Sequence, residues 1–133
     1  MRSVRRQVMD PSLSSLLGFP LQVDSHAVDA LRQLRAEDKF TDLPGTNTAD
    51  EKLRCTAKVN EMLDRLISGI QQHPRKSWVL EQFVPTLESA CQEDTEARER
   101  FEPYLERVMD VLGIESSDGM LNHYLAFGGD DAA

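Results

Sequence analysis

The amino-acid sequence predicts an all-α protein, and three observations support this prediction. Apolar residues recur at intervals of three and four through most of residues 24–128, which is the period of one face of an α-helix. Residues typical of helix starts and stops separate these runs. No segment alternates apolar and polar residues as a half-buried β-strand does. We therefore expect a single compact bundle of about five helices in residues 24–128.

Residues 1–23 are expected to form a basic tail followed by a short helix. The tail carries Arg2, Arg5 and Arg6. Asp10-Pro11 resembles a helix N-cap with proline at the first helical position, and Gly18 is a typical stop. The apolar residues of this short helix are Leu13, Leu16 and Leu17.

The first helix of the bundle should be capped by Asp24 or Ser25 and run out near Asp38. Its apolar residues are Val28, Leu31 and Leu34. Phe40 is expected to pack into the core at the point where the chain leaves this helix. The following residues, FTDLPGTNT, are rich in turn-forming types and predict a connector.

The longest helix is predicted over residues 48–72. Thr48 and Glu51 have the spacing of a capping box, in which the two side chains satisfy free backbone amides. From Val59 to Ile70 the apolar residues form one continuous stripe. Gly69 lies inside this stripe although glycine costs about 1 kcal/mol relative to alanine in a helix. We therefore expect either a fraying helix end or another helix crossing closely at Gly69.

Three further helical segments follow. The pattern over residues 75–92 continues through Pro85, which predicts a kinked helix or two abutting segments. Residues 95–112 are predicted to form the next helix, capped by Asp94 or Thr95 and stopped by Gly113. A short helix should begin at Ser116 or Ser117 and end at Gly128-Gly129, and residues 129–133 form a polar tail.

The charge of the chain is concentrated in its last third. The whole sequence has 15 Lys and Arg residues against 23 Asp and Glu residues, a net charge of -8. Residues 1–80 sum to +2, whereas residues 81–133 sum to -10. This distribution argues against a general nucleic-acid binder and favours a cationic partner or a well-solvated surface.

The most organised polar feature is a row of four carboxylates in the segment 95–112. Glu99, Glu102, Glu106 and Asp110 recur at intervals of 3, 4 and 4, so one helix would align them as an acidic ridge. Repulsion along such a ridge could be relieved by a protein with a basic surface. The alternative is an ordinary solvated face, offset by nearby arginines.

Trp78 is the second candidate for partner binding. It follows a short basic stretch, Arg75-Lys76, and is the only tryptophan in the chain. A tryptophan beside cations is typical of an interface anchor. The alternative is a core residue whose indole N–H is hydrogen-bonded.

Metal binding and catalysis lack a sequence signature. His26, His73 and His123 are far apart and fit no metal-ligand spacing, and Cys55 and Cys91 form no CxxC pair. No phosphate-binding loop or nucleophile elbow is present. No run reaches the roughly 18 apolar residues of a membrane span. We assign no catalytic residue, metal or cofactor, and expect a cytoplasmic protein that binds neither membranes nor nucleic acid.

Three stretches resemble a family of small, all-helical bacterial proteins, domain of unknown function 4844. They are KSWVLEQFVPTLES (76–89), DTEARERFEPYLERVMDVLGIESSDGMLN (94–122) and FTDLPGTNT with the later EKL (40–53). The resemblance covers roughly residues 40–125. It implies a bacterial, cytoplasmic helical domain with no established activity, so no functional residue is carried over from it.

Three functional hypotheses follow. The leading one is a non-enzymatic interaction domain, such as an immunity-type inhibitor, whose acidic face covers a basic surface of its partner. The second is a small hydrolase that pairs His73 or His123 with a carboxylate or with Cys91 in a groove between helices. The third is a homodimeric scaffold in which the +2 half of one chain faces the -10 half of the other.

Overall fold

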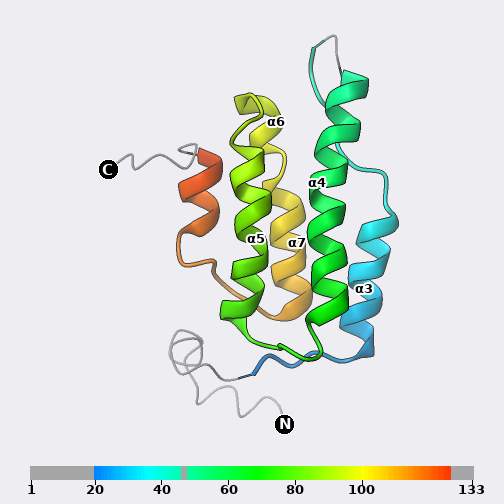
Figure 1. Ribbon diagram of the computed structural model, residues 1–133, viewed down its shortest axis with the longest axis vertical. Helices are drawn as coiled ribbons and strands as arrows, with labels where there is room; N and C mark the ends of the chain where they lie inside the picture. Colours follow the sequence, from blue (N-terminus) through cyan, green and yellow to red (C-terminus); the bar gives the residue numbers. More distant parts are fainter. Residues whose placement is uncertain (1–19, 46–47, 127–133) are drawn as a thin grey trace.

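The computed structural model describes residues 20–45 and 48–126, and these residues form helices joined by turns (Figure 1). The elements are α3 (Ser25–Ala36), α4 (Thr48–Gly69), α5 (Lys76–Ala90), α6 (Thr95–Glu99), α7 (Glu102–Leu112) and the π-helical η1 (Asn122–Ala126). No β-strand occurs in these two ranges, so the predicted all-α class is confirmed. The expected short helix of Leu13, Leu16 and Leu17 lies outside the described residues.

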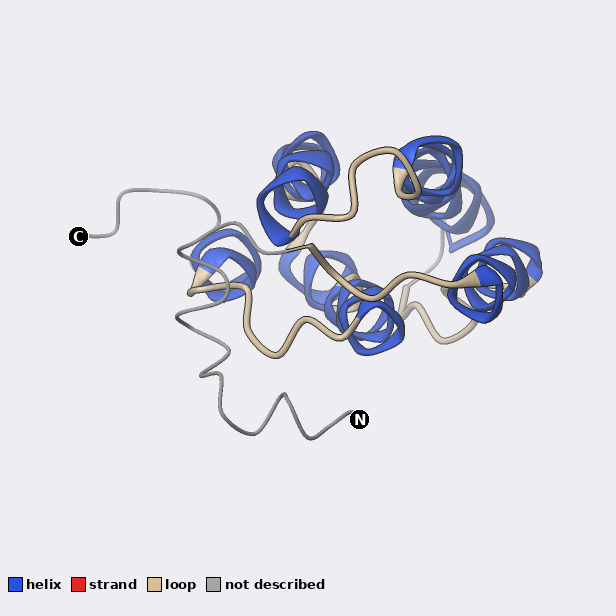
Figure 2. Cartoon of the chain, turned by 90° about the horizontal axis from the view of Figure 1, so that it is seen from below, coloured by secondary structure: helices blue, strands red, loops and turns tan. Residues whose placement is uncertain are grey.

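The elements α3, α4, α5, α7 and η1 alternate in direction along the chain (Figure 1), as short connections favour. α4 packs against α3 on one side and α5 on the other, and α7 packs against α3 (Figure 1). η1 contacts α5 and α6 at the opposite edge of the bundle. Viewed from below, the helices are seen nearly end-on around a shared interior (Figure 2). None of the described helices combines the length and apolarity that crossing a membrane requires.

The interior is filled by the apolar stripes of all these helices. Aromatic side chains meet where α3 ends: the ring centroids of Phe40 and Phe101 lie 4.9 Å apart, and those of Phe40 and Tyr104 lie 5.0 Å apart. The predicted role of Phe40 at the exit of α3 is therefore confirmed. Fully buried residues of the core include Leu31, Val59, Met62, Leu63, Leu66, Ile70, Phe83, Leu87, Leu105 and Val108.

Local chemistry explains where the helices begin and where they approach each other. The carboxylate of Asp24 accepts a hydrogen bond from the Ala27 N–H at 3.0 Å and caps α3. At the end of α4, Gly69 faces Trp78: a Cβ on Gly69 would lie 2.7 Å from a carbon of the indole ring. Gly69 is the last residue of α4, and Trp78 of α5 lies directly against it, so both of the alternatives expected at Gly69, a helix end and a close approach of another helix, are present.

α5 continues through Pro85 as one helix rather than as two abutting segments. Proline removes one backbone donor from the helix. Arg65 of α4 reaches this turn and donates hydrogen bonds to the Gln82 carbonyl at 2.7 Å and to the Thr86 hydroxyl at 3.3 Å. α4 thus braces the turn that contains the proline.

The expected helix over residues 95–112 is wrong as a single element. It divides into α6 and α7 at Arg100 and Phe101. Pro103 lies in the first turn of α7 and has no N–H to bond the Glu99 carbonyl, so the α-helical ladder is interrupted there. The Arg100 side chain donates to the Glu96 carbonyl at 2.7 Å and satisfies a free acceptor at the end of α6.

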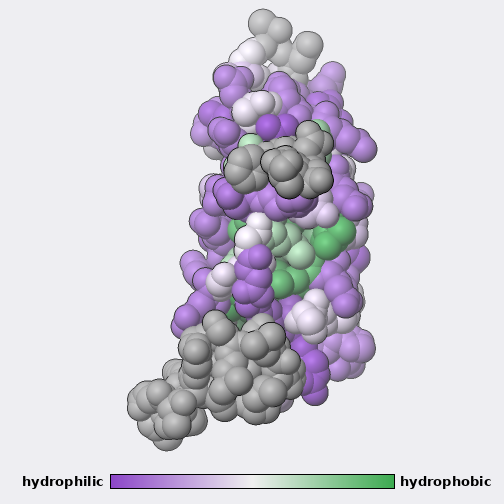
Figure 3. Space-filling model, turned by 90° about the vertical axis from the view of Figure 1, so that its left-hand side faces the viewer, coloured by the Kyte–Doolittle hydropathy of each residue, from purple (hydrophilic) through white to green (hydrophobic). Residues whose placement is uncertain are grey.

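The surface of these helices is largely hydrophilic, with one visible exception. Figure 3 shows an apolar patch on the left-hand edge of the molecule as it is drawn in Figure 1, where η1 lies beside α5. Half-buried apolar residues on these two segments are Leu80, Val84, Met120 and Tyr124. We call the surface that these four residues form the α5–η1 seam.

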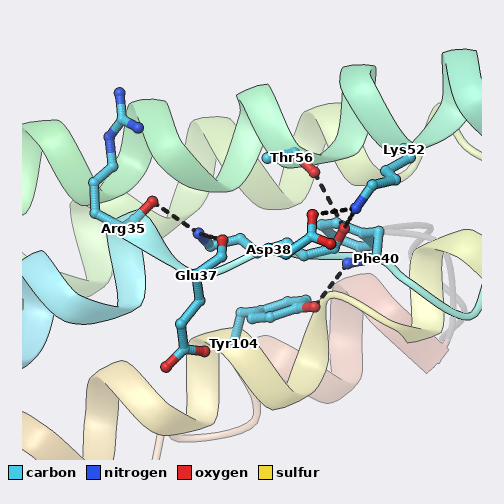
Figure 4. A network of polar contacts seen from close by, with 8 residues as sticks. Arg35, Glu37, Asp38, Phe40, Lys52, Thr56 and Tyr104 are labelled. Atoms are coloured by element: carbon cyan, nitrogen blue, oxygen red, sulfur yellow. Dashed lines mark hydrogen bonds and ion pairs between the residues drawn. The ribbon is translucent and has the colours of Figure 1, made fainter.

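A polar network at the end of α3 fixes the position of α7 relative to α3 and α4 (Figure 4). The buried Lys39 ammonium donates to the Arg35 and Glu37 carbonyls at 3.0 and 2.9 Å, and so caps the C-terminus of α3. Burial lowers the pKa of Lys39. Phe40, in the left-handed region with φ 56°, donates its N–H to the Tyr104 hydroxyl at 2.9 Å. This bond joins the segment that follows α3 to the first turn of α7.

Candidate functional site

A shallow groove of about 350 Å³ lies between α7 and the segment that follows it. Glu102, Glu106 and Asp110 line one wall, at successive turns of α7. The other wall comes from residues 114–122 and is mostly polar. Its lining residues are Ile114, Glu115, Ser116, Ser117, Gly119, Leu121 and Asn122. We call this feature the acidic groove.

The groove exists because the chain reverses directly after α7. Gly113 adopts φ 76° and donates its N–H to the Asp110 carbonyl, and the Ile114 N–H reaches the Met109 carbonyl at 2.8 Å. This is a glycine C-cap of the kind predicted from the sequence. Ile114 is buried, which turns the following residues back along α7.

Serine side chains shape the far wall of the groove. The Ser116 hydroxyl accepts from the Asp118 N–H at 3.0 Å, and the Ser117 hydroxyl accepts from the Leu121 N–H at 3.2 Å. Asp118 and Gly119 both have positive φ, 59° and 88°, as expected of a tight turn before a helix. The predicted cap at Ser116 or Ser117 is therefore present, although the element it precedes is the π-helical η1.

The carboxylates on α7 crowd one another. The pKa of Glu106 is raised above its usual value, first by partial burial and then by hydrogen bonding with and repulsion from Glu102, with a smaller contribution from Asp110. A raised pKa means that the ionised form of the Glu106 carboxyl group is less favourable at this position than it is in water. A cation placed in the groove would reverse this effect.

The arginines expected to offset the acidic face are engaged elsewhere. Arg107 pairs with both carboxylate oxygens of Glu37 at 2.6 and 2.8 Å, and thereby ties α7 to α3. Arg98 donates to the Leu125 carbonyl at 3.2 Å and supports η1. Among the described residues, no ion pair reaches Glu102, Glu106 or Asp110.

The structure brings three of the four predicted ridge residues together and separates the fourth. Glu99 is exposed at the end of α6 and does not line the groove. The expected alignment of Glu99 with the others on one helix is therefore wrong, because the interruption before Pro103 ends that helix. Glu102, Glu106 and Asp110 remain the candidate residues.

Trp78 lies apart from these carboxylates. Its indole is half-buried, contacts Gly69 and stacks on His73 with ring centroids 5.2 Å apart. It belongs to the crossing of α4 and α5, and it does not line the acidic groove. Its proposed part in partner binding stays a prediction.

The histidines lie in three separate parts of the chain, two of them in α3 and η1 and the third in the connection between α4 and α5, and all three are exposed. His26 is in the first turn of α3, His73 stacks on Trp78, and the ring of His123 meets Tyr124 edge-on at 5.0 Å. Cys91 donates through its sulfur to the Tyr124 carbonyl at 3.5 Å. Within residues 20–45 and 48–126, no group of His, Cys, Asp and Glu residues is arranged to hold a metal ion.

The far wall of the groove and two buried ionic residues are not predictable from the sequence patterns described above. Glu93 is buried against Arg54 and Lys58 of α4, and Lys39 is buried at the end of α3. The sequence signal for the far wall was a set of turn-forming residues, Ser116, Ser117 and Gly119. Nothing local marks Glu93 or Lys39, because their partners are distant in sequence or are backbone carbonyls.

A family model, domain of unknown function 4844, matches residues 22–127. The chain belongs to this family. The match begins before α3, so the domain of unknown function 4844 includes one helix more than the resemblance over roughly residues 40–125 implied. In this chain the 4844 domain therefore contains α3, the central helices and both walls of the acidic groove. No curated protein and no solved structure matches the chain.

Proposed function

We propose that the protein is a non-enzymatic interaction domain whose acidic groove receives a basic segment on the surface of a partner protein. One observation carries the proposal. Glu102, Glu106 and Asp110 share one solvent-accessible groove, and no cation among the described residues pairs with them. Uncompensated like charges favour a partner that supplies the opposite charge.

The shape and lining of the groove indicate the chemistry of that partner. Sites for small molecules are usually concave and mainly apolar, whereas this groove is shallow and lined largely by carboxylates, serines and an asparagine. Lysine or arginine side chains from a loop or helix would meet carboxylates on one wall and hydroxyl groups on the other. A basic protein segment therefore fits the groove better than a compact metabolite does.

Binding a cation would also relieve the crowding on α7. The pKa of Glu106 is raised by burial and by its carboxylate neighbours, and a lysine or arginine beside it would favour the ionised form again. The negative charge of residues 81–133 would attract such a partner over a longer range and speed its capture. An inhibitor that covers the basic surface of a toxin or effector, in the cytoplasm of a bacterium, is the specific case that we favour.

The test is a comparison of two triple charge reversals in the full chain. The groove variant is Glu102→Lys/Glu106→Lys/Asp110→Lys. The control is Glu61→Lys/Glu81→Lys/Glu88→Lys, which changes three exposed carboxylates outside the groove and alters the net charge equally. The probe is a synthetic peptide of alternating Lys and Ala residues, and its dissociation constant is measured at physiological ionic strength.

We expect the groove variant to bind the peptide at least about tenfold more weakly than the unmodified chain, because three charge pairs at roughly 0.5 kcal/mol each sum to one decade. The control should lose no more than about twofold, since salt screens charges beyond about 8 Å. Equal weakening of both variants would show that the peptide responds to net charge alone and would remove the groove from the proposal.

The other two hypotheses have no specific observation in their favour. A hydrolase would need a histidine directed at a carboxylate or thiol in a pocket, whereas His73 stacks on an indole and His123 meets a tyrosine ring. A homodimeric scaffold needs a surface where the two charged halves meet. Both stay predictions from the sequence.

A further inference from the structure

The α5–η1 seam is an apolar surface whose four residues have matching spacings. Leu80 and Val84 are one turn apart on α5, and Met120 and Tyr124 are four residues apart on the segment beside it. The Cys91 sulfur contacts the Tyr124 carbonyl at one end of the seam, and Lys76 pairs with Asp118 at 3.1 Å at the other end. These two contacts hold α5 beside η1 and beside the turn that precedes η1, at the edge of the molecule where Figure 3 shows the apolar patch.

The chain enters the described structure at the lower end of this seam. Leu21 donates its N–H to the Pro74 carbonyl at 2.5 Å, directly before α5 begins. Leu21 and Val23 pack against the core, so the point of entry is fixed. The 19 residues before Pro20 are therefore attached beside Pro74, two residues before the start of α5, the helix that carries Leu80 and Val84.

The sequence of those residues is complementary to the seam. Leu13, Leu16 and Leu17 share one side of the helix predicted after Asp10-Pro11, and Ser15 falls on the opposite side. One helical turn, roughly 6 Å, separates Leu80 from Val84 along α5. Leu13 and Leu17 have the same four-residue spacing as Leu80 and Val84.

We propose that residues 10–19 dock on the α5–η1 seam of the same chain through Leu13, Leu16 and Leu17. The covalent connection at Pro20 favours docking of residues 10–19 of the same chain over docking of a second copy, because a short linker raises the effective concentration of a segment to the millimolar range. Docking would bury the leucines and the seam together, at about 25 cal/mol for each Å² of apolar surface removed from water. The proposal does not depend on the function assigned to the acidic groove.

Photo-cross-linking in the full chain tests the proposal. Leu17 is replaced by the photoreactive amino acid p-benzoylphenylalanine, and in a matched control Ser15, on the opposite side of the predicted helix, is replaced instead. After irradiation, cross-linked peptides are identified by mass spectrometry. We expect intramolecular cross-links from position 17 to residues 76–91 or 118–126, with a yield at least several-fold above that from position 15.

A second pair of variants checks the seam itself. Val84→Asp places a charge in the seam, whereas Leu53→Asp makes the same kind of change at an exposed residue of α4, 71% accessible. With the photoreactive group at position 17, Val84→Asp should remove most of the cross-link, and Leu53→Asp should preserve it. Circular dichroism verifies that both variants remain helical.

Three results would overturn the proposal. Equal yields from positions 15 and 17 would mean that the segment has no preferred face. Cross-links that map to other parts of the chain would mean that another surface receives it. Cross-links only between chains would assign the seam to a second copy.

Discussion

Gly69 is a position where the usual preference for alanine in a helix should be reversed. Glycine at an exposed helical site costs about 1 kcal/mol relative to alanine. Here a methyl group would lie 2.7 and 2.8 Å from two carbons of the Trp78 ring, closer than carbon atoms can approach. The indole stacks on His73, whose ring also lies 3.8 Å from this methyl position, so the methyl group would enter a site that is already lined by two rings.

We expect Gly69→Ala to lower the free energy of unfolding by about 1–3 kcal/mol, the usual cost of overpacking. The measurement is urea unfolding at neutral pH. In the background of Trp78→Leu the same change should be neutral or stabilising, because the obstructing ring is gone. If Gly69→Ala is stabilising in the unmodified background, the close contact at this crossing does not exist in solution.

At the scale of elements, one ionic cluster joins α4 to the end of α5. Glu93 is buried and accepts hydrogen bonds from Arg54 at 2.9 and 2.8 Å and from Lys58 at 2.6 Å. Lys58 also donates to the Ser89 carbonyl at 3.0 Å in the last turn of α5. Hydrogen bonds from Arg54 and then Lys58 lower the pKa of Glu93 to about 2, against the cost of burial.

This cluster predicts a specific dependence of stability on pH. Because the pKa of Glu93 falls from 4.5 to about 2 on folding, its contribution is complete above pH 4.5 and is lost as the pH falls toward 2. A pKa shift of this size corresponds to about 3 kcal/mol in the free energy of unfolding at neutral pH. We expect a contribution of about 2 kcal/mol, because the Arg54 side chain is 49% exposed and solvent screens its interaction with Glu93.

The corresponding experiment compares Glu93→Gln with the unmodified chain by urea unfolding between pH 7 and pH 2.5. Glu93→Gln should be less stable at pH 7, and the difference should shrink as the pH falls. Glu88→Gln, at an exposed position of α5, is the matched control and should show almost no difference. A deficit in Glu93→Gln that does not vary with pH would indicate a packing effect and would rule out the ionic one.

The helices themselves were largely predictable, because cap chemistry and apolar period are local signals. Asp24 and Asp94 cap α3 and α6, each accepting a backbone N–H three residues later at 3.0 Å, and Gly113 ends α7. The break between α6 and α7 was missed because Phe101 and Leu105 continue the apolar period across it. Pro85 and Pro103 show the limit of the signal: one lies within a continuous helix and the other follows a break.

The candidate site was predictable only in part, for a related reason. The spacing of Glu102, Glu106 and Asp110 places them on one face of a helix, which the sequence shows directly. The opposite wall depends on Ile114 entering the core and on the serine-supported turn that follows. Those contacts form between segments after folding, so a helical period cannot reveal them.

At the scale of the whole molecule, the negative charge of the chain is used in two different ways. Glu37, Asp64 and Glu93 pair with arginines on neighbouring helices and hold the bundle together. The carboxylates of the acidic groove have no such partner in the described part of the chain. The distinction separates charge that stabilises the fold from charge that is available to another protein.

Mapping the bound cationic peptide onto the full chain by NMR is the most direct test of whether the acidic groove receives a basic segment. The alternating Lys-Ala peptide is titrated into isotopically labelled protein, and the backbone amide signals are followed. We expect the largest shifts to fall within residues 102–122 and to saturate together, while the amide signals around Glu61, Glu81 and Glu88 barely move. Shifts spread evenly over all exposed carboxylates, or largest outside residues 102–122, would contradict this expectation.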